Sequence, residues 1–193
     1  MLTAIFKDWA RRAAQPVALT LGSLGLTPNM LTVIGFALSV GVAVILWLGH
    51  LSIGGFLVLV VSAFDMLDGA LARATRQTTR FGAFLDSTLD RYSEAALLTG
   101  LLMFLVVQGD QLGSLLAIAA LVGSFMVSYT RARAEGLGLS CEVGWLARPE
   151  RIIILGLGLI FGLAVPALAV VAVLANFTAG QRVAHVWRAT REQ

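Results

Sequence analysis

The chain has 193 residues, of which 58% are apolar and 13% charged, and its formal net charge is +3. Soluble domains are typically about one quarter charged, so this composition excludes a soluble globular protein. It predicts an all-α integral membrane protein with a single domain over residues 1–193, surrounded by membrane lipids and not bound to nucleic acid. Cys141 is the only cysteine, which excludes an internal disulfide, and two histidines give no reason to expect a zinc site.

Residues 1–14 lack the apolar core that a cleaved signal peptide needs. Their apolar side chains instead recur at helical spacing, at Leu2, Ile5, Phe6 and Trp9. This pattern predicts that residues 1–25 comprise an amphipathic helix on the membrane surface, at residues 1–14, and a linker. The alternative is an ordinary frayed terminus.

A membrane span needs about 20 apolar residues. Over residues 26–193 we therefore expect a bundle of six transmembrane helices, at residues 30–48, 52–74, 82–108, 113–133, 150–165 and 167–188. Three short connections are expected, at Gly49–His50, Gly109–Asp110 and Val165–Pro166. The fifth of these spans is short for a full crossing.

All 14 lysines and arginines lie at one set of span ends, and the three short connections on the opposite side carry none. The positive-inside rule then places both termini and the arginine-bearing loops in the cytoplasm. The chain is therefore expected in the cell membrane as a multi-pass protein, with any chemistry near these loops at the cytoplasmic leaflet.

Four aspartates lie around the connection between the second and third predicted spans. Asp65 and Asp68 are three residues apart near the end of the second predicted span, and Asp86 and Asp90 are four apart near the start of the third. Each pair shares one face of its helix. Because the two helices are antiparallel neighbours, the four carboxylates are expected at one depth.

Four carboxylates this close need protons or divalent cations to neutralise them. Ligand sets made of oxygen alone favour hard cations such as Mg²⁺, Mn²⁺ or Ca²⁺. Two Mg²⁺ ions would match the four charges, and paired metals about 4 Å apart suit phosphoryl transfer. The alternative interpretation is a pathway for protons or ions.

Small residues and an arginine accompany the aspartates. Gly69, Ala72 and Gly82 lie on the aspartate faces and leave room for a substrate, while Arg73 is placed to pair with a diphosphate. Alternatively, the small residues only allow tight helix packing, and the arginine only sets the topology.

The full pattern is Asp65-x2-Asp68-Gly69-x2-Ala72-Arg73-x8-Gly82-x3-Asp86-x3-Asp90. It resembles, without departure, the signature of the CDP-alcohol phosphotransferase family, also called CDP-alcohol phosphatidyltransferases. The resemblance extends over most of the chain, since members of that family have six spans preceded by a surface helix.

The resemblance implies an enzyme that cleaves the diphosphate of a CDP-linked lipid, such as CDP-diacylglycerol, moves the phosphatidyl group to a hydroxyl and releases CMP. It implies that Asp65, Asp68, Asp86 and Asp90 hold two Mg²⁺ or Mn²⁺ ions, with Asp90 also acting as the base. It further implies a homodimer, and a CDP-binding set made of Pro28, Asn29, Met30, Leu31, Thr32, Gly69, Ala72, Arg73, Thr79 and Gly82. A plain helix start capped by Thr27 or Asn29 is the alternative for the first of these segments.

A second group of arginines bears on the acceptor. Arg131, Arg148, Arg151 and Arg182 are expected to form a basic pocket that faces the metals and binds an anionic acceptor, most simply a phosphate ester. The alternative is topology together with local pairing to Glu135 and Glu150.

The stretches R-A-R-A-E and R-P-E-R resemble the phosphatidylinositol-phosphate synthase branch of the family, whose acceptor is inositol phosphate. Arg131 departs from that branch, which typically has lysine there. Glycerol-3-phosphate, the acceptor of phosphatidylglycerophosphate synthases, is the nearest rival, and an uncharged acceptor such as serine fits less well.

The competing class is a transporter or channel, which predicts carboxylates at several depths along a path. Here the ionisable residues stop at one level, which favours an interfacial site. A purely structural scaffold leaves the aspartates unexplained.

Overall fold

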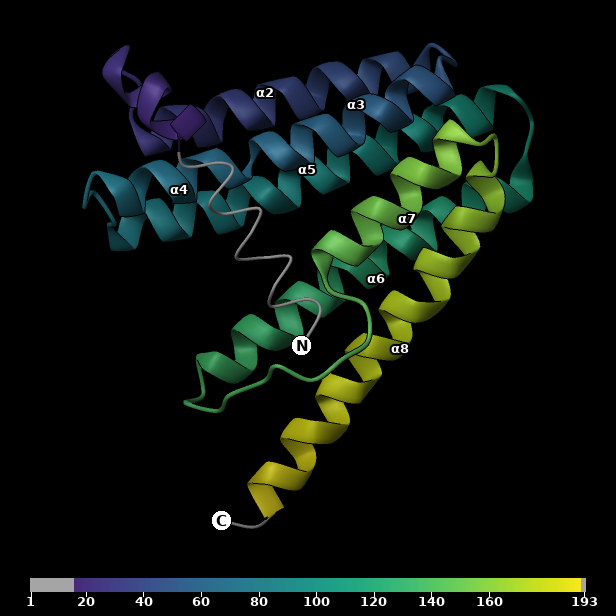
Figure 1. The fold of residues 1–193 in the computed structure, drawn as a ribbon. Coiled ribbons are helices and arrows are strands. Elements are labelled where there is room, and N and C mark those ends of the chain that lie inside the picture. Colours follow the sequence, from purple (N-terminus) through teal and green to yellow (C-terminus); the bar gives the residue numbers. More distant parts are fainter. Residues whose placement is uncertain (1–15, 192–193) are drawn as a thin grey trace. The chain divides into compact units, whose positions relative to one another are not determined.

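The computed structural model describes residues 16–191, and every regular element within that range is a helix, which confirms the all-α prediction. Residues 16–23 form a helix, and the elements that follow are α2 (Pro28–Trp47), α3 (Leu51–Phe64), α4 (Met66–Ala74), α5 (Arg80–Val107), α6 (Gln111–Glu135), α7 (Arg148–Ile160) and α8 (Ala164–Arg191) (Figure 1). The amphipathic helix predicted from residues 1–14 lies outside the described range.

Four described segments are long and apolar enough to cross a membrane: α2, the combined segment Leu51–Ala74, α6 and α8. Helices of this length and apolar composition are typical of a membrane protein. Helix α5 has 28 residues, but its first fifteen residues include the acidic side chains of Asp86, Asp90 and Glu94. Helix α7 has only 13 residues, fewer than the roughly 20 that a perpendicular crossing takes.

Glycines in the left-handed region end three of the helices. Gly49, Gly109 and Gly162 have φ angles of +86°, +72° and +71°. After each glycine the next amide donates back to a carbonyl five residues earlier, which satisfies a group that the helix end would leave exposed. The connections predicted at Gly49–His50 and Gly109–Asp110 are confirmed.

The connection predicted at Val165–Pro166 is wrong. Helix α7 ends at Ile160 and α8 begins at Ala164, so the turn comprises residues 161–163. The amide of Leu163 donates to the carbonyl of Gly158 at 2.6 Å. Pro166 lies in the first turn of α8, where a missing N–H costs nothing because that turn has no acceptor for it.

The single helix expected over residues 52–74 is divided at Asp65. This residue follows α3 and occupies the position before the first residue of α4, with φ −56° and ψ −22°. Its amide still donates to the carbonyl of Val61 at 3.0 Å, so the chain continues in nearly the same direction. The side chain of Asp65 does not cap α4.

The chain forms two compact units. The first contains residues 16–41 and 60–94, and the second contains 42–59 and 95–191. The buried core of the first unit consists of Ala18, Leu31, Leu67, Ala70 and Leu71. This core holds the start of α2 against α4 and so fixes which side chains of the two helices meet.

In the second unit α6 packs along α8, and α7 also contacts α8 (Figure 1). Asn176 on α8 donates from Nδ2 to the carbonyl of Ala119 on α6 at 3.0 Å. One buried cluster, made of Val127, Leu146, Ala175 and Ala179, joins the two helices to the loop that precedes α7.

Candidate active site

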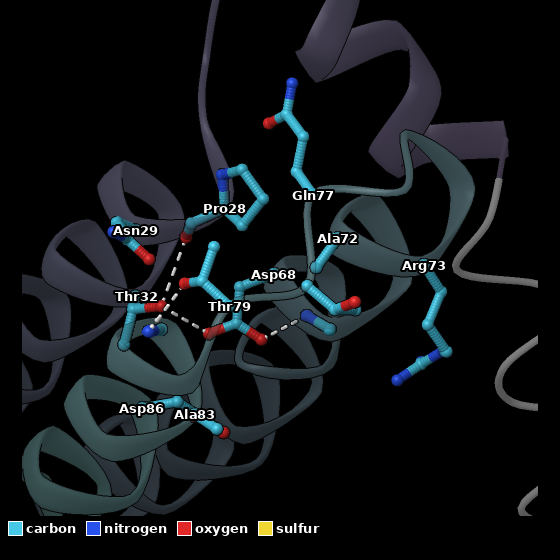
Figure 2. Close-up of a pocket in the computed structure, with 13 residues that line it drawn as sticks. Pro28, Asn29, Thr32, Asp68, Ala72, Arg73, Gln77, Thr79, Ala83 and Asp86 are labelled. Carbon is cyan, nitrogen blue, oxygen red and sulfur yellow. Dashed lines mark hydrogen bonds between the residues drawn. The ribbon is translucent and has the colours of Figure 1, made fainter.

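A cavity of about 200 Å³ opens within the first unit (Figure 2). It is bounded by the start of α2, by α4, by the turn after α4 and by the start of α5. Its lining residues are Pro28, Asn29, Thr32, Asp68, Gly69, Ala72, Arg73, Gln77, Thr78, Thr79, Gly82, Ala83 and Asp86.

The α2 wall of the cavity is set by a helix start that the sequence predicts. Thr27 caps α2, with its Oγ1 accepting from the amide of Met30 at 3.3 Å. Pro28 occupies the first helical position, which its fixed φ favours. Asn29 and Thr32 then lie on the cavity side of the first turn.

A tight reversal brings α4 and α5 to the same cavity. Arg76 has φ +55°, a left-handed conformation that side chains rarely adopt, and the amide of Gln77 donates to the carbonyl of Ala72 at 2.9 Å. Thr79 then caps α5, its Oγ1 accepting from the amide of Gly82 at 2.9 Å. The reversal brings Asp68 of α4 and Asp86 of α5 to the lining of the same cavity.

Of the four predicted metal ligands, Asp68 alone is buried, at 7% exposed, whereas the other three are partly exposed. Its Oδ2 lies 2.6 Å from the hydroxyl oxygen of Thr32, and its Oδ1 accepts from the backbone amide of Gly69 (Figure 2). A buried carboxylate needs such donors to offset its lost hydration. Thr32 and Gly69 therefore hold Asp68 in one orientation.

The other aspartates lie around this centre. Asp86 lines the cavity, whereas Asp65 and Asp90 are not among its lining residues. Asp65 lies against α2, where a Cβ added at Gly35 would be 2.5 Å from its Oδ1. The Asp90 side chain is 20% exposed, and its Oδ2 lies 4.0 Å from Nη1 of Arg91.

The four aspartate carboxylates supply only oxygen ligands, and such ligands suit a hard divalent cation. Asp68 and Asp86 also open onto the same cavity. Within residues 16–191, however, no three acidic, histidine or cysteine side chains stand close enough to form a ready metal site.

All of the predicted CDP-binding residues except Met30 and Leu31 line the cavity. Met30 is 46% exposed, and Leu31 is 1% exposed within the core that joins α2 to α4. A Cβ added at Gly82 would lie 3.0 Å from Oγ1 of Thr79 and 3.1 Å from Oδ1 of Asn29, so a side chain there would enter a crowded place.

Sequence reasoning did not single out Gln77 or Ala83, which also line the cavity. The signal for Gln77 was its place in the turn between the two halves of the aspartate pattern. The contact of Gly35 with Asp65 had no local signal, because it depends on how α2 packs against the following helices.

The four arginines predicted to bind the acceptor belong to the second unit. The Arg131 side chain is 47% exposed. Its Nε lies 2.8 Å from Oε1 of Glu135, and its Nη2 lies 3.9 Å from Oε1 of Glu142. The local pairing with Glu135 that the sequence left open is therefore present.

Arg182 and Arg151 are deeply buried, at 5% and 2% exposed. Arg182 donates from Nε to the carbonyl of Val143 at 2.9 Å and from Nη1 to the carbonyl of Val127. Arg151 donates from Nη1 to the carbonyl of Leu146 at 3.4 Å. Both side chains therefore contact the loop before α7. Arg148, the fourth predicted arginine, is the first residue of α7 and directly follows this loop.

The chain is similar to several known proteins. The sequence pattern of CDP-alcohol phosphatidyltransferases matches residues 25–185. The archaetidylinositol phosphate synthase of Pyrococcus horikoshii is 39% identical over 174 residues, which are 90% of each chain. Two crystal structures of the phosphatidylinositol phosphate synthase of Mycobacterium tuberculosis are also similar.

The first of these structures has CDP-DAG bound, and the second is a complex with manganese and citrate. Both align with a TM-score of 0.86 at 36% identity. The CDP-DAG complex covers 91% of this chain and 94% of its own, and the manganese complex covers 90% and 88%.

Proposed function

Since the chain belongs to the CDP-alcohol phosphatidyltransferase family, we propose that it transfers a phosphatidyl group from CDP-diacylglycerol to a hydroxyl of inositol phosphate and releases CMP. The observation that carries this proposal is the cavity that Asp68, Asp86, Arg73 and Thr79 all line. The names of the similar synthases, and the CDP-DAG bound to one of them, support both the donor and the acceptor.

In this proposal the cavity receives the CDP part of the donor, while its lipid tails stay in the bilayer. Arg73 pairs with the diphosphate through its guanidinium. A Cβ added at Gly69 would lie 3.1 Å from Nη1 of Arg73, so the glycine leaves room for that guanidinium beside α4. Asn29, Thr79 and Gly82 supply the remaining wall against the nucleotide.

Asp65, Asp68, Asp86 and Asp90 are proposed to hold two divalent cations, Mg²⁺ or Mn²⁺. The manganese in the similar crystal structure supports this set. Bound there, the cations would shield the diphosphate charge and make CMP a better leaving group. The Thr32 hydroxyl and the Gly69 amide keep the Asp68 carboxylate oriented for this purpose.

Asp90 is proposed as the general base. Its carboxylate takes the proton of the acceptor hydroxyl as that oxygen forms a bond to the phosphatidyl phosphorus. The bond from this phosphorus to the CMP oxygen breaks, and its electron pair leaves with CMP. A side chain that is 20% exposed can be reached by a water-soluble acceptor.

The phosphate of the acceptor is proposed to bind to Arg131, Arg148, Arg151 and Arg182. These four arginines lie on α6, α7 and α8 of the second unit. In support of the proposal, Arg151 and Arg182 both contact the loop before α7. Guanidinium groups suit a phosphate because they donate two parallel hydrogen bonds.

We further propose six membrane spans, with α5 and α7 as the third and fifth, and an N-terminal surface helix. Both termini and the active site would face the cytoplasm, and two copies would form a homodimer. The support for the orientation is the confinement of all 14 lysines and arginines to one set of span ends.

The deciding experiment incubates the purified protein with CDP-diacylglycerol, Mg²⁺ and one acceptor at a time, and measures CMP release. The acceptors are inositol-1-phosphate, glycerol-3-phosphate, inositol and serine. Release with inositol-1-phosphate alone is expected. Release with glycerol-3-phosphate alone would keep the mechanism and overturn the acceptor, and no release with any acceptor, with Mn²⁺ also tried, would overturn the function.

A further inference from the structure

We propose that Gly35, on α2, is a positioning residue for Asp65, because its missing side chain leaves the room in which the Asp65 carboxylate sits. This inference rests on the proposed function, in which Asp65 is a metal ligand. Gly35 lies outside the aspartate pattern and is not one of the residues that line the cavity.

The contact is close. A Cβ atom added at Gly35 would lie 2.5 Å from Oδ1 of Asp65 and 3.6 Å from Cδ1 of Phe64. The second distance is an ordinary van der Waals contact, but Cβ atoms essentially never come within 3.0 Å of a non-bonded heavy atom from elsewhere in the chain. With any other residue at this position, either the helices or the carboxylate must move.

The carboxylate is the part that yields more easily. It is the end of a side chain with two rotatable bonds, whereas the backbone of α2 is fixed by its helical hydrogen bonds and by the packing of Leu31 in the core. The substitution is therefore expected to displace a metal ligand and to leave the fold nearly unchanged.

The same face of α2 meets a second aspartate one turn earlier. The Thr32 hydroxyl lies 2.6 Å from Oδ2 of Asp68. Thr32 and Gly35 are three residues apart on α2, and Asp68 and Asp65 are three apart in the opposite direction along the facing segment. One turn of α2 thus supplies a donor to one proposed ligand and space to the other.

The chain offers a matched control in Gly41. It lies on the same helix, and a Cβ added there would meet nothing within 4 Å. Glycine-to-alanine substitution at either position changes intrinsic helix propensity equally, by about 1 kcal/mol. A difference between Gly35→Ala and Gly41→Ala therefore reports on the contact with Asp65.

The experiment measures Mn²⁺ affinity of the purified full chain by electron paramagnetic resonance, together with thermal stability. Gly35→Ala is expected to weaken Mn²⁺ binding by about tenfold to a hundredfold, the usual range when the surroundings of a metal ligand are altered. Gly41→Ala is expected to bind as the unmodified chain does, and both variants should melt at similar temperatures.

A double-mutant cycle separates positioning from a general packing effect. In an Asp65→Ala background, Gly35→Ala should weaken Mn²⁺ binding no further, because no carboxylate remains to be displaced. If Gly35→Ala reduces the yield of folded protein, Asp65→Ala should restore that yield for the same reason.

The inference is overturned if Gly35→Ala binds Mn²⁺ like Gly41→Ala, if it weakens binding equally in both backgrounds, or if Asp65→Ala does not restore a lowered yield. One further result would contradict the proposed function itself. If Asp65→Ala alone retains full Mn²⁺ affinity, Asp65 is not a metal ligand, and the proposed ligand set fails together with this inference.

Discussion

The hydroxyl oxygen of Thr32 lies 2.6 Å from Oδ2 of Asp68, which joins the first described membrane helix to the aspartate pattern through a buried hydrogen bond. The similarity to a known family implies that Thr32 helps line the nucleotide pocket. The structure adds a second role, because the same hydroxyl orients a carboxylate that is 7% exposed.

Thr32→Val removes this donor while keeping the shape of the side chain. A buried carboxylate that loses one donor costs about 1–3 kcal/mol, so both the melting temperature and the Mg²⁺ affinity should fall. Thr32→Ser should restore most of both, because it returns the hydroxyl. Thr190→Val serves as the control, since the Thr190 hydroxyl donates to carbonyls of its own helix. Equal losses of melting temperature and Mg²⁺ affinity in the two valine variants would contradict the prediction.

Asp90→Asn should lower the rate of CMP release by about 10²–10⁴-fold, the usual contribution of a general base, with little change in melting temperature. Asp110→Asn is the matched control. Asp110 caps α6 by accepting from the amide of Gly113 at 2.8 Å, and asparagine caps a helix equally well. Unchanged turnover in Asp90→Asn, measured with saturating Mg²⁺, would remove Asp90 from the mechanism.

Arg131 and Arg182 should respond differently to substitution by glutamine. Arg131 is 47% exposed, and an exposed ion pair contributes only about 0–1 kcal/mol, so Arg131→Gln should raise the KM for inositol phosphate without a large loss of stability.

Arg182→Gln removes donors to the carbonyls of Val127 and Val143. It should therefore lower the melting temperature as well as acceptor binding. Steady-state kinetics and thermal unfolding of both variants test this pair of predictions. A stable Arg182→Gln variant, or an Arg131→Gln variant with an unchanged KM, would contradict the corresponding assignment.

Arg76→Gly should stabilise the protein by about 1 kcal/mol, because Arg76 has φ +55° and only glycine adopts this region without strain. Arg76→Ala keeps the strain and removes the same charge, so it isolates the effect of the backbone. Unfolding in denaturant measures both variants. Arg76→Gly should be the more stable of the two, and the reverse order would show that the left-handed conformation carries no strain.

The proposed topology predicts which side of the membrane can be labelled. In a Cys141→Ala background, cysteines at Gln108 and Thr190 should react from opposite sides, since both positions are exposed and belong to opposite sets of span ends. A thiol reagent that cannot cross membranes, applied to intact cells, should label only the cysteine at position 108. Labelling at position 190 would reverse the orientation.

Much of the site could be predicted from sequence because its chemistry is local. The spacing of Asp65, Asp68, Asp86 and Asp90 indicates shared helix faces, and the polar turn between the two pairs implies antiparallel helices. These two facts suffice to bring Asp68 and Asp86 to one cavity, as the structure has them.

The missed features depend on packing or on helix ends. Gly35 lies in an almost wholly apolar helix, so nothing in its own neighbourhood indicates that Asp65 packs against it. The turn predicted at Val165–Pro166 followed from the proline, but a proline is tolerated in the first turn of a helix. Gly162, with φ +71°, lies in the turn that follows α7.

The cavity described above is built from a short part of the chain, since all of its lining residues lie between Pro28 and Asp86. Every arginine proposed for the acceptor comes later, from Arg131 onward. Under the proposed function, donor and acceptor recognition are thus encoded one after the other in the gene. Under the proposed function, mutations downstream of the cavity can alter which alcohol is used while the nucleotide pocket is inherited intact, which is a simple route to the divergence of lipid headgroups within one family.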